Sequence, residues 1–338
     1  MSPKKSPEGS ALAPVMAVGT FVVDYHKVID HFPRERMSAK VRREQVSHGG
    51  APLNVLIALA KLGVSFPLHA GGKVGSDLDG RLIVDCCNDH GIDISQLQVV
   101  EGANTGYTDV FTVESTSRHT CFHYSGIGDT FARKDVKLRA VKPKILFLGS
   151  LGALGKMDNH NGDYGRKGAT QLLRDATKQE ITTLIEIAPT NGSGDLEDFK
   201  ETIPFADYLV LNDRLAENML GMEVSSEGLV DPELATKAAA KIFACGLRKA
   251  VVIQAGHAAV YVGADGTVVE QSRKRLPSKQ RVGSAGVDHA FTAGFIEGLY
   301  HDKPVETCLQ QGLAVAKACR RDLSPSGSIV ALADCLRL

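Results

Sequence analysis

Near the C-terminus, a turn that contains glycine runs into a helix-like segment at "RVGSAGVDHAFTAGF", residues 281–295. Backbone N–H groups at the start of a helix bind anions such as phosphate, because the helix dipole adds to their positive charge. Here the turn residue Gly286 is followed by Asp288 and His289, at the place where such a turn holds phosphate. Both side chains are of types that accept a proton from an attacking hydroxyl group. The segment therefore predicts phosphate and proton-transfer chemistry.

A second glycine turn lies in "HGGAPLNVLIALAKLG", residues 48–63. Gly49 and Gly50 open the turn, Asn54 lies one turn into a helix, and Gly63 ends that helix. On one interpretation the glycines only make a tight connection, and Asn54 is a solvated residue of the first turn. On the other, bare backbone approaches a polar ligand, and the amide of Asn54 binds its hydroxyl groups.

The segments between these turns alternate between strand-like and helix-like patterns. "FPLHAGGKVG" precedes a helix for which Ser76 is the expected N-cap, and a helix over residues 231–243 precedes the strand "KAVVIQAG". Strict alternation of this kind indicates a mostly parallel sheet that is covered on both faces. We therefore predict a three-layer α/β fold with helices on both faces of a central sheet.

Two segments break the alternation, at about residues 22–48 and 103–126. The first is polar, and the second alternates apolar and polar residues around a Ser-Thr-Ser turn, as a β-hairpin does. Together they predict a small β-sheet lid over the main sheet. The expected organisation is a disordered tail over residues 1–12 and one domain over residues 13–338, with neither a signal peptide nor a membrane span.

Composition narrows the class of partner. Lysine plus arginine and aspartate plus glutamate each number 39, so no net charge attracts nucleic acid or an anionic membrane. The seven cysteines include no C-x-x-C pair, which is typical of a reducing compartment and predicts a cytoplasmic protein. We expect a small-molecule partner.

From about residue 15 to 335 the chain resembles the ribokinase-like (pfkB) carbohydrate kinase family, and "GGAPLNV" is similar to its fructokinase-type members. The matching features occur in the same order as in the family. They are Asp24 in the first strand, the set Gly49, Gly50 and Asn54, and the segments "GKVGSDLDG", "ADYLVLNDRLAENMLG", "VVIQAGHAAVYV" and "GSAGVDHAFTAGF".

The resemblance implies a ribokinase-like fold with a β lid, and transfer of the γ-phosphoryl group of ATP, with Mg²⁺, to a hydroxymethyl group of a sugar. It also implies roles for matching residues, although it assigns no metal ligand. The sugar would contact Asp24, Gly49, Gly50 and Asn54. The nucleotide and its phosphates would contact Asn212, Gln254, Gly256 and Gly286. A homodimer through the lid is compatible with the family.

The chain departs from the family pattern at the turn. Gly-Ala-Gly-Asp of the family is Gly286, Val287, Asp288 and His289 here, so the catalytic aspartate is replaced by His289. His289 and Asp288 are therefore the candidate catalytic residues. A neutral imidazole at a helix start accepts a proton, whereas a carboxylate at Asp288 repels a triphosphate. The glutamate of the family's Asn-x-x-Glu motif is Leu215.

Three functions remain open. The first is a sugar kinase with a rebuilt phosphate site, and the second is a family member that binds sugar or nucleotide as a sensor or partner, without efficient transfer. The third is a nucleoside kinase, which requires aromatic or apolar groups over a base. The predicted hairpin holds four aromatic residues, Tyr107, Phe111, Phe122 and Tyr124. A sugar is favoured over a nucleoside because "GGAPLNV" resembles fructokinases.

Overall fold

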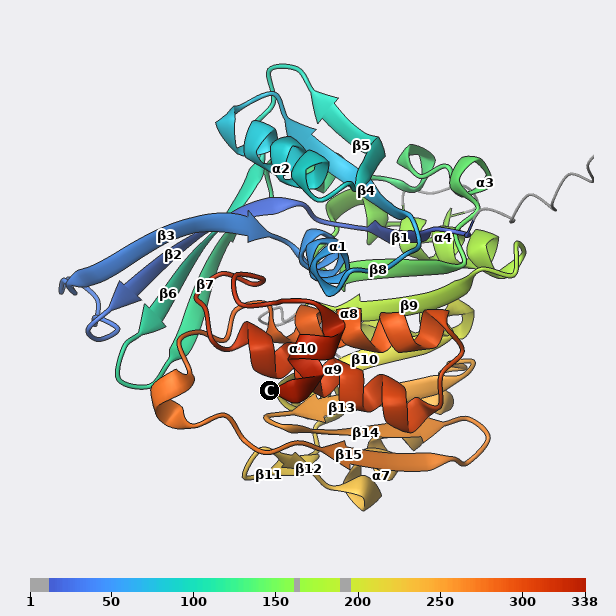
Figure 1. Ribbon diagram of the computed structural model, residues 1–338. Helices are drawn as coiled ribbons and strands as arrows, with labels where there is room; N and C mark the ends of the chain where they lie inside the picture. Colours follow the sequence, from blue (N-terminus) through green and yellow to red (C-terminus); the bar gives the residue numbers. More distant parts are fainter. Residues whose placement is uncertain (1–11, 161–164, 189–195) are drawn as a thin grey trace, which may run out of the picture.

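The computed structural model describes residues 12–160, 165–188 and 196–338, so residues 1–11 of the expected tail lie outside this description. A nine-stranded sheet runs through the centre of the molecule, in the order β15-β14-β13-β10-β9-β8-β1-β4-β5 (Figure 1). Its strands are β1 (Val15–Val18), β4 (Leu68–Gly75), β5 (Asp93–Val100), β8 (Ile145–Leu151), β9 (Thr182–Ile187), β10 (Tyr208–Asn212), β13 (Ala250–Ala255), β14 (Ala258–Gly263) and β15 (Val268–Ser272).

The strands from β13 to β5 along this order pair in parallel, and only β14 and β15 are antiparallel to their neighbours. The central strands are continuous apolar runs, and β1 and β13 are buried at every residue. Such runs are typical of parallel sheets with both faces covered. The predicted mostly parallel sheet is confirmed.

Helices cover both faces and form two separate apolar clusters with the sheet. On one face lie α1 (Ala51–Leu62), α2 (Leu78–Asp89), α8 (Val287–Tyr300), α9 (Val305–Cys319) and α10 (Leu332–Arg337). On the other lie α3 (Leu138–Val141), α4 (Gly168–Thr177), α5 (Leu196–Phe199), α6 (Asp213–Leu220) and α7 (Pro232–Phe243). In the described residues, no helix combines the length and the apolar character needed to cross a membrane.

The start of α2 differs by one residue from the prediction. The N-cap is Asp77 rather than Ser76, and its carboxylate accepts hydrogen bonds from the backbone N–H groups of Gly80 and Thr105, at 2.8 and 2.7 Å. The hydroxyl of Ser76 instead accepts from the N–H of Gly102 at 3.0 Å. A carboxylate that accepts two backbone hydrogen bonds at a helix start is a strong cap, which explains the shift.

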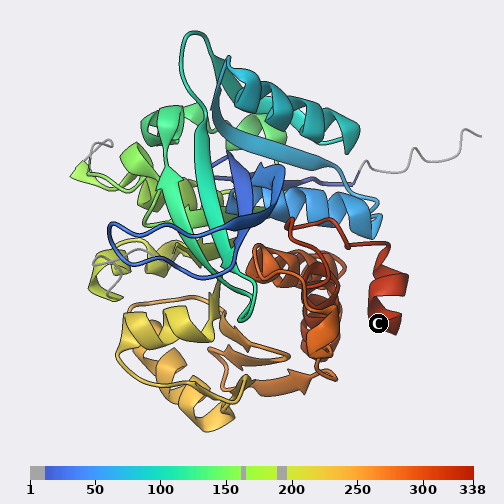
Figure 2. The same cartoon turned by 90° about the vertical axis from the view of Figure 1, so that its left-hand side faces the viewer.

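A second sheet of four strands, called the lid from here on, projects from the layered body in Figure 1 and faces the viewer in Figure 2. In the order β3-β2-β6-β7, it contains β2 (Val22–Ile29), β3 (Val41–Gly49), β6 (Gly106–Val113) and β7 (Arg118–Tyr124). Strands β2 and β6 are parallel, and β6 and β7 form the predicted antiparallel hairpin. A short pair, β11 (Ser225–Ser226) and β12 (Leu229–Val230), is separate from both sheets.

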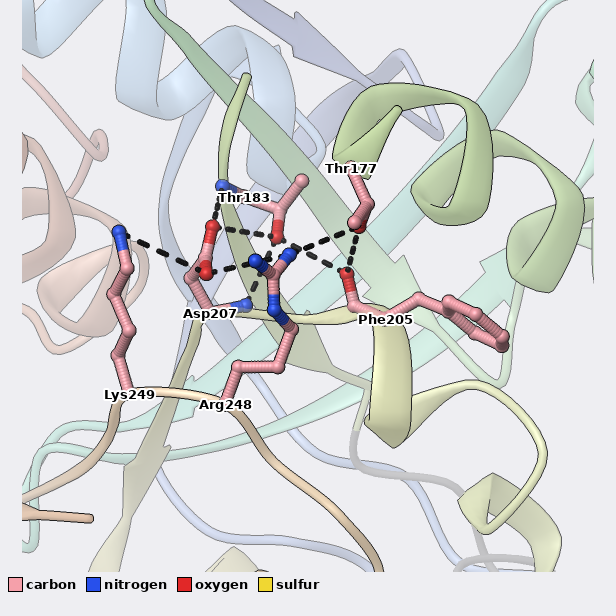
Figure 3. A network of polar contacts seen from close by, with 6 residues as sticks. All are labelled: Thr177, Thr183, Phe205, Asp207, Arg248 and Lys249. Atoms are coloured by element: carbon pink, nitrogen blue, oxygen red, sulfur yellow. Dashed lines mark hydrogen bonds and ion pairs between the residues drawn. The ribbon is translucent and has the colours of Figure 1, made fainter. Parts of the chain in front are cut away.

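At the amino ends of the central strands, a polar network around Asp207 ties β9, β10 and β13 together (Figure 3). The buried carboxylate of Asp207 accepts a hydrogen bond of 2.9 Å from the N–H of Thr183, and Arg248 and Lys249 lie within 3.8 Å of it. Arg248 also donates to the hydroxyl of Thr177 at 3.0 Å. These contacts hold the amino ends of the three strands together, at the edge of the sheet away from their carboxyl ends. Their role is therefore structural.

Candidate functional site

A cavity of about 350 Å³ lies between the lid and the carboxyl ends of the central strands. This is the usual ligand position in open parallel sheets, where loops leave the strand ends. The cavity brings together side chains from the lid, α1, the strand ends and the first turn of α8. Its polar and charged lining includes Asp24, Thr108, His119, Cys121, His123, Asn54, Ser150, Glu186, Asn212, Asp288 and His289.

Gly49 and Gly50 bring the start of α1 close to the lid strand that carries Asp24. A Cβ atom on Gly49 would lie 2.1 Å from Oδ1 of Asp24, and one on Gly50 would lie 2.1 Å from the carbonyl oxygen of Thr20. Gly50 also has a φ of 86°, which side chains rarely adopt. Both positions therefore require glycine, and the close approach places Asp24 and Asn54 in one wall.

Asp24 is buried, with 7% of its surface exposed. Burial raises the pKa of its carboxyl to about 7, although the charge of His289 and a hydrogen bond from Thr108 act in the opposite direction. A carboxyl with such a pKa both accepts and donates hydrogen bonds near neutral pH, as a sugar hydroxyl requires.

Asn54 joins two histidines into a hydrogen-bonded chain. Its Oδ1 accepts from Nδ1 of His48 at 2.8 Å, and its Nδ2 lies 3.0 Å from Nδ1 of His289. Nε2 of His48 is 2.7 Å from the hydroxyl of Ser326. Because the Asn54 amide donates to His289, Nδ1 of His289 is the acceptor and the ring proton lies on Nε2. Sequence reasoning missed His48 and Ser326.

The other ring nitrogen of His289, Nε2, lies 2.9 Å from Oε1 of Glu186. Burial lowers the pKa of His289, but the carboxylates of Glu186, Asp288 and Asp24 outweigh it, and the pKa is raised overall. Protonation of Nδ1 therefore requires the Asn54 amide to rotate and present its oxygen. Oε2 of Glu186 is buried without a hydrogen-bond partner. The sequence analysis did not select Glu186 either, although an acidic residue near the end of a hydrophobic strand indicates a candidate site residue.

Asp288 occupies the first turn of α8, which begins after Gly286 at a φ of 70°. Its Oδ2 accepts a hydrogen bond of 2.7 Å from the amide of Asn212, and its Oδ1 accepts one from the amide of Gln254. The oxygen of Asn212 caps α6 by accepting from the N–H of Leu215 at 2.8 Å. Thus two amides that the resemblance assigns to nucleotide and phosphate hold the carboxylate of Asp288.

Gly256 lies apart from the other predicted residues. It has a φ of 54°, in the turn between β13 and β14, and lines a second cavity of about 190 Å³. The residues expected to bind nucleotide and phosphate therefore do not all line one cavity. Gly286 and Asn212 face the cavity beneath the lid, Gly256 faces the second cavity, and the Gln254 side chain contacts Asp288.

The residues around Asp288 do not fit Mg²⁺ by themselves. Among the described residues, no group of three or more histidine, cysteine, aspartate or glutamate side chains is arranged to hold a metal ion. Each oxygen of Asp288 already accepts an amide hydrogen bond. Protein sites usually hold Mg²⁺ through one or two carboxylates together with substrate phosphates.

The chain matches the model of the pfkB family carbohydrate kinases over residues 13–330. It is similar to ribokinase from Arabidopsis thaliana, with 21% identity over 98% of this chain and 82% of the relative. It is also 29% identical to a nucleoside kinase from Methanothermobacter thermautotrophicus, over 38% of this chain and 40% of the relative.

Solved structures show the same fold. The structure of Arabidopsis thaliana ribokinase complexed with ribose and ATP superposes with a TM-score of 0.78 at 20% identity, covering 97% of this chain and 99% of that chain. The nucleoside kinase of Burkholderia thailandensis, in complex with inosine, gives a TM-score of 0.69 at 16% identity, covering 95% and 96%. The ribokinase-like fold with its small separate sheet is confirmed.

Proposed function

Because the chain belongs to the pfkB family of carbohydrate kinases, we propose that it binds a sugar beneath the lid and transfers phosphate to it only slowly. Members of the family are ATP-dependent phosphotransferases that act on sugars or nucleosides, and the chain has the ribokinase-like fold. The altered first turn of α8, with Asp288 and His289, distinguishes this chain from an efficient kinase.

The cavity lining supports a sugar rather than a nucleoside. Carboxyl, amide and hydroxyl groups from Asp24, Asn54 and Thr108 line it, and such groups form hydrogen bonds with sugar hydroxyls. No phenylalanine or tyrosine is among the described residues that line it. The alternation of β6 and β7 places the aromatic side chains of the hairpin on the face of the lid opposite to Thr108 and His123.

One observation supports slow transfer above the others. The side-chain amides of Asn212 and Gln254 both donate hydrogen bonds to the carboxylate of Asp288. The N-terminus of a helix stabilises a carboxylate for the same reason as it stabilises phosphate, because both are anions near backbone N–H groups. Asp288 thus acts as an internal anion in the phosphate position. A triphosphate that approached it would meet repulsion as well as amides that are already occupied.

The position of His289 adds to this effect. Both of its ring nitrogens contact protein groups, Asn54 on one side and Glu186 on the other. A sugar hydroxyl must displace the amide of Asn54 before Nδ1 can take its proton. Loss of an effective general base costs about 10²- to 10⁴-fold in rate.

The sugar site is tested by replacing Asp24 or Asn54 with alanine. We expect each change to abolish the rise in melting temperature that a sugar produces, because this rise depends on affinity by mass action. The measurement is a thermal shift with a panel of sugars, read against the unliganded melting temperature of each variant. Asn88→Ala, on the exposed side of α2, is the matched control and should keep the full shift. An unchanged shift in both cavity variants would place the sugar elsewhere.

A second candidate is an active sugar kinase in which His289 and Glu186 act together as the base. The contact between Nε2 of His289 and Oε1 of Glu186 favours it, because a carboxylate in this position orients the ring and stabilises its protonated form. Rapid transfer by the wild-type protein would select this candidate over slow transfer.

The outer face of the lid supports a homodimer. Exposed apolar side chains there include Val46, Tyr107, Phe122 and Tyr124. Pairing of two lids would remove these side chains from water. Sedimentation of the wild-type protein and of a Phe122→Glu variant tests this assembly. We expect the wild-type protein to be a dimer and the variant to be a monomer.

A further inference from the structure

Five side chains form a hydrogen-bonded chain in the wall of the cavity beneath the lid. In order, they are Ser326 after α9, His48 of β3, Asn54 of α1, His289 of α8 and Glu186 of β9, at successive distances of 2.7, 2.8, 3.0 and 2.9 Å. Ser326, His48 and Asn54 are buried, with 3%, 8% and 4% of their surfaces exposed. Buried polar groups require partners of the matching type, so a donor must meet an acceptor at each contact.

While His289 is neutral, this requirement gives the chain one direction. Nε2 of His289 donates to the carboxylate of Glu186, so Nδ1 accepts from the amide nitrogen of Asn54. The amide oxygen of Asn54 then accepts from Nδ1 of His48, and Nε2 of His48 accepts from the hydroxyl of Ser326. His48 therefore carries its ring proton on Nδ1 in this state.

A proton on Nδ1 of His289 reverses the direction. Nδ1 becomes a donor, and the amide of Asn54 must rotate to present its oxygen. The amide nitrogen then faces His48, which accepts from it only if its ring proton lies on Nε2 instead of Nδ1. Nε2 donates to the hydroxyl oxygen of Ser326 in this state. Ser326 also lines a groove of about 620 Å³ between β3, α2 and the segment after α9, so its own hydroxyl proton can turn toward solvent.

His48 stays neutral in both states. Burial lowers the pKa of its imidazole to about 4, the hydrogen bond with Asn54 acts in the opposite direction, and the charges of Lys61, His90 and His26 lower it further. Titratable groups of α2 also line the groove beside His48, namely Arg81, Asp85, Cys86 and Asp89. Above about pH 4, His48 thus has one ring proton and differs only in which nitrogen carries it.

His289 changes its charge at higher pH than His48. Burial lowers the pKa of His289, but the carboxylates of Glu186 on β9, Asp288 on its own helix and Asp24 on β2 raise it overall. As the pH falls, His289 therefore takes up a proton while the ring of His48 is still neutral.

From this chain of contacts, we propose that His48 is a positioning residue for His289, whose ring proton moves between Nδ1 and Nε2 as His289 gains or loses a proton. Asn54 connects the two rings by rotating its amide. One proton is taken up, at Nδ1 of His289. His48 releases the proton of Nδ1 to solvent and takes one at Nε2, so its charge does not change. The exchange lets Asn54 serve both forms of His289.

For catalysis, the exchange allows His289 to accept the proton of a sugar hydroxyl without leaving a buried donor facing another donor. A side chain of fixed hydrogen-bonding type in place of His48 would suit only one direction of the Asn54 amide. This catalytic role rests on the proposed function. The exchange itself requires neither sugar nor ATP, so it is measured in the unliganded protein.

The test is NMR of the ring nitrogens in protein with ¹⁵N-labelled histidine, between pH 5 and pH 9. The chain has 11 histidines, and the signals of His48 and His289 are identified by their loss in the His48→Asn and His289→Asn variants. We expect the proton of His48 to move from Nδ1 at high pH to Nε2 at low pH, with the same midpoint as the titration of His289. A wild-type His48 ring that keeps its proton on one nitrogen throughout would overturn the inference.

Two variants test the connection through the amide. Asn54→Leu removes it, and we expect the protonated nitrogen of His48 to stay the same while His289 titrates. Ser324→Ala is the matched control, because the hydroxyl of Ser324 lies on the same segment as Ser326 but donates to Asp322 at 3.0 Å, and it should keep the exchange. An exchange that persists in Asn54→Leu would mean that the two rings are not coupled through Asn54. Unliganded melting temperatures check folding, and the wild-type titration needs no variant.

The catalytic role is tested by transfer at saturating sugar. His48→Leu should lower the rate at least about tenfold, because the Asn54 amide loses a buried partner in both directions. His48→Asn should keep most of the rate, since its amide presents either a donor or an acceptor to Asn54. Equal losses in the two variants would contradict the role. If wild-type protein bound no sugar, the proposed function would fail while the exchange at His48 remained measurable, so the two failures are distinguishable.

Discussion

Replacing Asp288 by glycine and His289 by aspartate is expected to raise the rate of phosphoryl transfer to the bound sugar by about 10²-fold or more. The glycine removes the anion from the first turn of α8 and frees the amides of Asn212 and Gln254 for phosphate. The aspartate restores the carboxylate that the family pattern places at this position. Transfer is measured at saturating sugar with ATP and Mg²⁺ in a coupled assay.

One neighbour affects this double variant. Glu186 contacts His289 and would face a second carboxylate after His289→Asp, which disfavours the charged form of both groups. The matched variant therefore adds Glu186→Gln, and we expect it to be at least as active as the double variant. Asp288→Gly alone should improve ATP binding with a smaller gain in rate. A double variant slower than the wild-type protein would show that Asp288 and His289 perform chemistry of their own.

Replacing Asp24 by asparagine is expected to stabilise the unliganded protein at pH 8 by about 4 kcal/mol relative to wild type. Burial raises the pKa of Asp24 from 3.8 to about 7. Between these values the folded state holds a proton that the unfolded state has lost, so stability falls as the pH rises from about 4 to about 7. Asparagine does not ionise and escapes this loss.

The measurement is urea unfolding of both proteins between pH 4 and pH 8. The difference in free energy of unfolding should be smallest near pH 4, grow by about 1.4 kcal/mol per pH unit, and level off above pH 7. Asp85→Asn, on the exposed surface of α2, should lack this growth. A difference that does not change with pH would mean that Asp24 is not held in its neutral form by burial. The stabilised variant would also show that the carboxyl of Asp24 is retained at a cost in stability.

The fold and much of the cavity follow from local features of the sequence. Alternating apolar and helical segments predict the parallel sheet, because strands buried on both faces must be apolar throughout, as β13 is. Gly49 and Gly50 predict the close approach of α1, because a side chain there would collide with Asp24 or Thr20. The ribokinase-like fold was predicted through the family resemblance. The fructokinase-like character of "GGAPLNV" stays a prediction.

The site residues that the sequence did not predict are brought together by contacts between distant parts of the chain. Glu186 and His289 are far apart in sequence and meet only because β9 ends beneath the first turn of α8. Ser326 reaches His48 across 278 positions. The sequence predicts repulsion between Asp288 and phosphate, but not that Asn212 and Gln254 satisfy the carboxylate, since this depends on the parallel register that sets Asn212 beside Gln254.

The central claim is that this protein binds sugar in a kinase cavity whose phosphate position is filled by Asp288. Its most direct test is a single-turnover measurement with the sugar-saturated wild-type protein, using ATP labelled in the γ-phosphate and Mg²⁺. Kinases turn over at about 1–100 s⁻¹, and a loss of about 10²- to 10⁴-fold brings transfer to a rate between about 10⁻⁴ and 1 s⁻¹. We predict a labelled sugar product at or below this rate, together with saturable sugar binding. Transfer faster than about 1 s⁻¹ would contradict the claim and make His289 and Glu186 the working base of an active kinase.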